Sequence, residues 1–228
     1  MTLRTPAAVA AALALAAGAA ACGGSSDSGS SGSSGSSSAA SSQSSSAKPV
    51  AKIDALSGKS TSVALDAGFV KALQSLKLTP APVGNATISK TGTATFPITG
   101  GNVTYYKPGS VSPYVQGKID HSGSGLSLTG GGKTVKLTNF VVDPGASVLT
   151  GKVSVDGKVA AKSAPLFFLN GSTLQPLQAK SNGTAILQGT TVELKDSAAQ
   201  LLNQTFGVKA LTNGLKIGVA KITVNTGA

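Results

Sequence analysis

The sequence predicts a mainly β domain, with two packed antiparallel sheets in a sandwich-like arrangement and two short helices. First, apolar and polar residues alternate in short runs across residues 115–158, as in strands with one buried face. Second, turn signals separate the runs: three glycines at 130–132, Asp-Pro-Gly at 143–145 and Asp-Gly at 156–157. Third, aromatic residues make up only 4% of the chain and there are 29 glycines, which favours a Val, Leu and Ile core on strands over a helix bundle.

The alternation in residues 115–158 predicts which side chains are buried. Val135 and Leu137 fall on the buried face of their strand, and Lys136 falls on the exposed face. The same reasoning places His121, the only histidine, on the apolar face at the end of its strand. Tyr105 shares an inward parity with Val103, whereas Tyr106 and Tyr114 have the opposite parity and are expected at the surface.

Two strand-helix units are expected on either side of this region. They occupy residues 61–65 with 67–76, and residues 190–194 with 197–206. We expect Asp66 and Asp196 to cap the helix N-termini and Gly207 to cap the second C-terminus. Further strands are expected at residues 87–88, 95–96, 103–105 and 215–224, and at the apolar run 164–169, which suits a segment buried on both sides.

The first 21 residues have the pattern of a secretory signal peptide. Arg4 precedes an uncharged run rich in Ala and Leu, and the run ends at Cys22. Small residues before a cysteine resemble a bacterial lipobox, in which the cysteine is diacylated and becomes the new N-terminus. Ordinary signal-peptidase cleavage, which would leave Cys22 a free thiol, is the alternative. We favour lipidation because a lone cysteine in an exported chain has no internal disulfide partner.

We expect residues 22–48 to comprise a lipidated cysteine and a Ser/Gly-rich linker, which has too few apolar residues to fold. We expect residues 49–228 to form a single domain. The expected location is the extracytoplasmic face of the cell membrane, with the lipid on Cys22 as the anchor.

The net charge of +11 does not predict nucleic-acid binding. Arg4, in the signal peptide, is the only arginine, and the lysines alternate singly with strand residues, as on solvated sheet faces. Phosphate forks and base stacking need arginines and aromatic residues, which this chain lacks in clusters.

The residue inventory argues against an enzyme and against a metal site. The chain has one His and one Glu, its aspartates are dispersed, and no spacing of His, Cys and Asp suits a metal ion. Asp120 points away from His121 if the strand continues, so it cannot orient the imidazole. For His121 two interpretations stay open: a half-buried histidine at a sheet rim, or a ligand to haem iron or another acceptor, with Tyr105 as a partner.

Four segments resemble the HtaA-type domain of actinobacterial haem-uptake proteins. They are FPITGG at 96–101, GKIDHSGSGLSL at 117–128, LTNFVVD at 137–143 and LTGKV at 149–153. The resemblance implies two antiparallel sheets with two short helices, and a haem contact at His121. The tyrosine that the family carries near a W-G-V opening has no counterpart, because the chain has no Trp and residues 69–76 contain no Tyr.

Two functions are therefore expected. The first is a non-catalytic cell-surface lipoprotein domain of binding or structural type, with haem or a cell-wall component as its partner. The second is a haem-binding protein of an uptake system.

Overall fold

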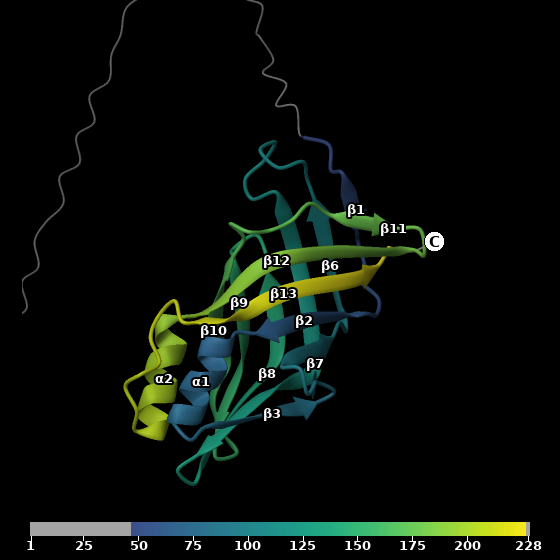
Figure 1. The fold of residues 1–228 in the computed structure, drawn as a ribbon. Helices are drawn as coiled ribbons and strands as arrows, with labels where there is room; N and C mark the ends of the chain where they lie inside the picture. Colours follow the sequence, from purple (N-terminus) through teal and green to yellow (C-terminus); the bar gives the residue numbers. More distant parts are fainter. Residues whose placement is uncertain (1–46, 227–228) are drawn as a thin grey trace, which may run out of the picture. The chain divides into compact units, whose positions relative to one another are not determined.

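The computed structural model describes residues 47–226, which form one β-rich domain with two helices (Figure 1). In chain order its elements are β1 (Ala51–Ile53), β2 (Ser60–Leu65), α1 (Ala67–Ser75), β3 (Thr79–Gly84), β4 (Thr87–Ile88), β5 (Thr93–Pro97), β6 (Gly100–Tyr105), β7 (Val115–Gly130), β8 (Lys133–Asp143), β9 (Val148–Val155), β10 (Lys158–Asn170), β11 (Gln178–Lys180), β12 (Thr184–Leu194), α2 (Asp196–Phe206) and β13 (Lys216–Asn225).

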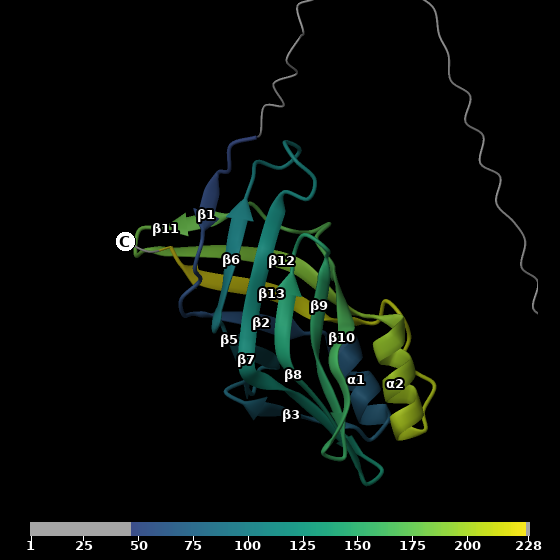
Figure 2. The same ribbon diagram turned by 180° about the vertical axis from the view of Figure 1, so that it is seen from behind.

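The strands form one continuous antiparallel sheet that curls over itself, and not the two separate sheets that we expected. The strand order is β1-β6-β7-β8-β9-β10-β12-β13-β2-β5-β4, with β11 paired to β12 and β3 paired to β7. Two walls result. In both views β12, β13 and β2 cross the strands of the β6–β10 wall at a steep angle (Figures 1 and 2). The mainly β class and the two helices are confirmed.

The long strand β7 shows how one sheet makes this curve. Its first half pairs with β6 and its second half with β3, while β8 runs along its other edge. The β7–β8 register shifts between His121 and Gly125, and at Gly125 a Cβ atom would lie 2.1 Å from the carbonyl oxygen of Leu137. Because a shifted register bends a strand, β7 turns here and continues. The sequence suggested that the strand ends at His121, but β7 continues to Gly130.

The consecutive antiparallel arrangement expected for residues 115–158 is confirmed. β7, β8, β9 and β10 pair in order, and Val135 and Leu137 are buried while Lys136 is exposed. Asp156 and Gly157 have φ values of 50° and 81°, and positive φ at both central residues is the requirement of a type I′ turn.

The two strand-helix units bring α1 and α2 together. β2 and β12 both run antiparallel to β13, which lies between them, so the helices that follow leave from the same end of the sheet (Figure 1). Asp66 caps α1 by accepting a hydrogen bond of 2.8 Å from the N–H of Gly68. Asp196 is not the cap of α2: it is the first helical residue, and Lys195 precedes it without a side-chain cap bond. Gly207 ends α2 in the left-handed conformation, as expected.

The sequence predicted that the apolar run in β10 is buried on both sides, and this holds for only part of the run. Leu166 and Phe167 are both buried, but Phe168 is 41% exposed. A register shift with β9 between Pro165 and Phe167 explains why two consecutive side chains are buried, since alternation breaks at a bulge.

A packed core lies where the helices cover the sheet. It contains Phe69 and Leu73 of α1, Leu202 of α2, and Leu128 and Leu137 beneath them. We call this region the closed end. β1 and β11 lie at the opposite end of the domain in both views (Figures 1 and 2). Neither helix in residues 47–226 is long and apolar enough to span a bilayer.

Candidate functional site

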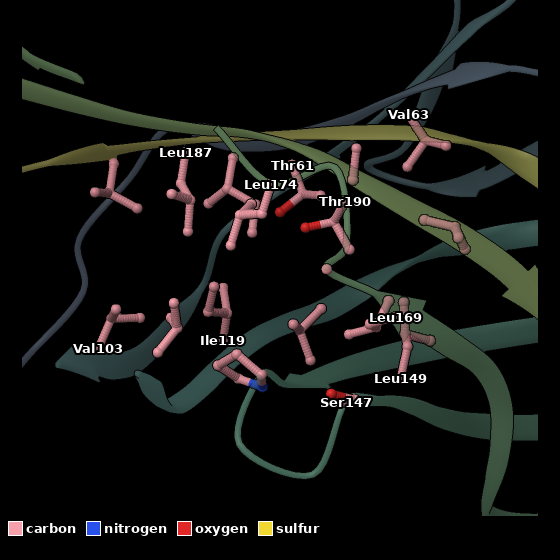
Figure 3. Close-up of a pocket in the computed structure, with 18 of the residues that line it drawn as sticks. Thr61, Val63, Val103, Ile119, Ser147, Leu149, Leu169, Leu174, Leu187 and Thr190 are labelled. Atoms are coloured by element: carbon pink, nitrogen blue, oxygen red, sulfur yellow. The ribbon is translucent and has the colours of Figure 1, made fainter. Parts of the chain in front are cut away.

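A cavity of about 520 Å³ lies between the two walls of the curled sheet. Figure 3 shows aliphatic side chains facing each other across it, with Val103, Ile119 and Leu149 on one side and Leu174 and Leu187 on the other. Most of the other residues that line it are also apolar. The volume falls within the range of about 300 to 1,000 Å³ that is typical of ligand pockets.

The cavity reaches the surface at the end of the domain opposite the helices. The exposed residues Ser112, Pro113 and Gly171 line it there, together with β1. We call this end the rim. Leu174 and Leu177 reach into the cavity from the loop between β10 and β11, which is held by hydrogen bonds between Gln175 and Gln188.

The deep end of the cavity is aromatic. Phe96 packs edge-to-face on Phe140, with ring centroids 5.3 Å apart, and Phe140 packs on Phe167 at 6.5 Å. The ring of His121 joins this cluster at 6.4 Å from Phe96. Leu65 and Leu126 line both the cavity and the closed end, so the helix-covered core forms the floor of the cavity.

His121 points inward, as expected, and is buried more deeply than a rim position would allow. The residue is 2% exposed, and its Nε2 atom lies 2.9 Å from the hydroxyl of Thr61 on the facing wall. Burial lowers the pKa of His121 to about 4, although the main chain of Phe140 and the charge of Asp120 act in the opposite direction. The main chain of Phe140 approaches the imidazole but does not form a hydrogen bond with it. Nδ1 of His121 therefore has no partner among residues 47–226. His121 is therefore a neutral imidazole at physiological pH.

The Asp120 side chain does not contact the imidazole. Its Oδ1 atom forms an ion pair with Nζ of Lys118 at 3.2 Å. Lys118 and Asp120 lie on the outer face of β7, because they alternate along the strand with the inward-facing Ile119 and His121. The opposite-face arrangement expected from the sequence holds in the structure.

Two tyrosines stand together at the rim. Tyr105 is 6% exposed, as its inward parity predicted, and its ring packs edge-to-face on Tyr114 with centroids 5.9 Å apart. Both line the cavity, and within residues 47–226 neither hydroxyl makes a hydrogen bond and neither is fully buried. Tyr114 is therefore not the surface residue that the sequence suggested. It precedes the first residue of β7, so strand alternation does not apply to it.

Tyr105 and His121 occupy one cavity but lie at different depths. Tyr105 pairs with Val115 in an unbroken register between β6 and β7, and His121 lies six residues further along β7. Six residues of strand span roughly 20 Å. Two ligands of one iron must lie within a few ångströms of each other, so these two side chains cannot both bind a single haem iron from opposite faces.

Thr61 is a deep polar residue that sequence reasoning missed, and Thr190 lies on the same wall of the cavity (Figure 3). Thr61 lies on β2, 60 positions before its partner His121, and becomes relevant only because the sheet curls. The position of Thr61 in a predicted strand could have indicated a buried hydroxyl, but only weakly. Within the described part of the chain, no three His, Cys, Asp or Glu residues are grouped so as to hold a metal ion.

The structure is similar to the crystal structure of the C-terminal domain of HtaA from Corynebacterium glutamicum. The match has 16% sequence identity and a TM-score of 0.53, and it covers 76% of this chain and 99% of that domain. A domain-swapped dimer of a histidine-to-alanine variant of the same HtaA domain matches with 15% identity and a TM-score of 0.44, over 71% of this chain and 92% of the other. The sequence matches no protein-family model and no curated protein. At this level of identity the likeness shows a shared fold.

Proposed function

We propose that the chain is an exported, lipid-anchored domain that binds an apolar small molecule in the cavity of its curled sheet and performs no catalysis. One observation carries the proposal: a cavity of about 520 Å³ lined mostly by aliphatic and aromatic side chains. Protein interiors are normally packed at the density of organic crystals, with few voids larger than a water molecule. Apolar space of this size is typical of a binding site.

The position of the cavity favours a binding role over a purely structural one. The helices need only the closed end for packing, where Leu73 and Leu202 are 1% and 4% exposed. The cavity is accessible at the rim and becomes fully enclosed toward His121. A ligand can therefore enter without unfolding the core.

Binding of an uncharged fluorescent probe tests this function. N-phenyl-1-naphthylamine should give saturable fluorescence enhancement with residues 47–226. Ala220, which is 6% exposed, lines the cavity, and its neighbour Lys221 faces outward. Ala220→Phe should abolish the saturable enhancement, and Lys221→Phe should leave it intact. Absence of saturable binding by the wild-type domain, or equal binding by both variants, would refute the proposal.

The lipid anchor is a separate part of the proposal. Cys22 and the segments 1–21 and 22–46 lie outside the described residues. The lipobox resemblance predicts that the full chain partitions into the detergent phase of Triton X-114, and that Cys22→Ala moves it to the aqueous phase or stops its processing. If the wild-type chain stays in the aqueous phase and maleimide labels Cys22, the lipid anchor is refuted and simple secretion is supported.

Haem is the second candidate ligand. The HtaA-type resemblance implies it, and the size and apolar lining of the cavity suit a porphyrin. The expected iron ligand does not fit: His121 Nε2 bonds to Thr61, and Nδ1 is buried without access to solvent. Of the expected pair His121 and Tyr105, only Tyr105 could approach an iron, because its hydroxyl is free and faces the cavity.

Titration with hemin separates the two ligands. If haem binds, a saturable Soret band should appear and should be lost in Tyr105→Phe, whereas His121→Ala should retain it. A band lost only in His121→Ala would restore the histidine as ligand. If no saturable band appears, haem is excluded and the apolar ligand stands.

A further inference from the structure

We infer that the cavity binds an amphipathic molecule, with the apolar body inside and a hydrogen-bond-accepting head at the hydroxyls of Tyr105 and Tyr114. This inference rests on the proposed function, since it assumes an occupied cavity, and it adds the chemical class and the orientation of the ligand.

The unpaired hydroxyl of Tyr105 is the first reason. Tyr105 is only 6% exposed and lines the cavity, and its hydroxyl makes no hydrogen bond within residues 47–226. The hydroxyl is not fully buried, so a ligand can reach it. Hydroxyls of mostly buried tyrosines usually find a hydrogen-bond partner, which a ligand can supply here. Tyr114, with its ring centroid 5.9 Å from that of Tyr105, adds a second free hydroxyl at the same place. A ligand atom that accepts from both would satisfy both.

The two ends of the cavity differ in a way that sets the orientation. At the deep end the polar atoms Nε2 of His121 and Oγ1 of Thr61 bond to each other, and phenylalanine rings surround them. Nδ1 of His121 is unpaired but fully buried, so a ligand cannot reach it. The hydroxyl of Thr190 lies on the same cavity wall as Thr61, and the remainder of this end offers an apolar packing surface (Figure 3). At the rim, two phenol groups stand beside exposed residues. The apolar end of an amphiphile therefore points inward, toward Phe140.

The head is an acceptor because the rim supplies donors. Burial and the neighbouring Tyr105 both raise the pKa of Tyr114, so its phenol stays protonated at neutral pH and donates its O–H. Phenol groups hydrogen-bond readily to carboxylate, phosphate or ester oxygens. The net charge of +11 adds attraction for an anionic head.

The chain enters the described domain at this same rim. The N–H of Val50 donates to the carbonyl of Tyr105 at 2.8 Å, and Ala51 pairs with Tyr105 in the β1–β6 register. If Cys22 is anchored as proposed, the tether joins the domain beside the cavity opening. Lipids, which are amphiphiles with acceptor heads, are then the nearest ligands of the inferred class.

Two surfactants of equal chain length test the head group. Dodecanoate has an acceptor head, and dodecylammonium has only donors. Both are measured by displacement of N-phenyl-1-naphthylamine from residues 47–226. The double variant Tyr105→Phe/Tyr114→Phe keeps both rings and removes both hydroxyls. Tyr106→Phe is the matched control, because Tyr106 does not line the cavity.

We expect the double variant to weaken dodecanoate binding about tenfold or more, from the loss of two hydrogen bonds, with dodecylammonium binding and Tyr106→Phe unchanged. The chain has no Trp and three Tyr, so tyrosine fluorescence of the wild type should also respond to dodecanoate. Equal dodecanoate affinity in wild type and double variant, with the probe still bound, would overturn the head-group assignment and leave the cavity function intact. Failure of the probe itself to bind would overturn both.

Discussion

The strand β7 passes through two regions of the molecule that are packed in opposite ways. Toward its end, Leu128 belongs to the closed end, where α1 and α2 cover the sheet and only about 40 Å³ stays open between the side chains. Toward its start, Val115 and Ile119 line the cavity, where the facing wall stays at a distance. The same strand, with the same alternation, thus contributes to a stabilising core and to a binding surface.

The difference teaches that burial alone does not identify a core. Val115 and Ile119 are 7% and 2% exposed, like residues of the closed end. They nevertheless face a space that holds no protein atoms. Side chains at the closed end should therefore control stability, and side chains around the cavity should control binding.

The largest expected effect is at the closed end. Leu137→Ala should lower the free energy of unfolding by about 2 to 4 kcal/mol, because it removes burial and leaves a void that neighbours fill poorly. Lys136→Ala, on the opposite face of the same strand, should stay within about 0.5 kcal/mol of the wild type. Urea denaturation measures both. Similar midpoints for the two variants would mean that the strand faces are assigned wrongly.

The next effect concerns His121 and pH. Its pKa is about 4 in the folded state and about 6.5 when unfolded, so the unfolded state binds more protons between these values. The stability that His121 contributes is complete above pH 6.5 and is lost as the pH falls toward 4. Between pH 7.5 and pH 5 the loss should be roughly 2 kcal/mol.

His121→Gln should reduce this pH dependence, and since the chain has no other histidine, no second imidazole can mask the change. Urea denaturation at the two pH values gives the comparison. An unchanged loss of stability in the variant would show that the histidine is not buried as described.

The smallest effect is expected at the cavity wall. Leu187 lines the cavity and is only half-buried, so Leu187→Ala removes contacts without creating a new void. The cost should be about 1 kcal/mol or less, well below that of Leu137→Ala. A cost equal to that at Leu137 would mean that the cavity region is packed like a core.

Local features of the fold could be predicted because they depend on neighbours in sequence. The alternation around Lys136, the turn at Asp156 and Gly157, and the cap at Asp66 all follow from local rules. The strand β3 was missed because its two prolines, Pro80 and Pro82, are unfavourable in a sheet interior, and the strand forms only at an edge against β7.

The cavity itself could not be predicted, because it depends on how far one sheet curls. The pairing of β10 with β12 joins the two walls, and no local pattern specifies it. His121 and Tyr105 were correctly placed inward by parity, but their separation along the cavity emerged only from the β6–β7 register. The role of Tyr114 lay beyond strand rules, since it stands in the loop before β7.

One measurement tests the central claim most directly. Leu187→Trp places a single tryptophan in the cavity wall of a chain that has none. Titration of this variant with dodecanoate should shift the tryptophan emission to shorter wavelength and saturate at one ligand per chain, because the alkyl body displaces water around the indole. A folded variant whose emission does not change with dodecanoate would contradict a cavity that takes an apolar ligand.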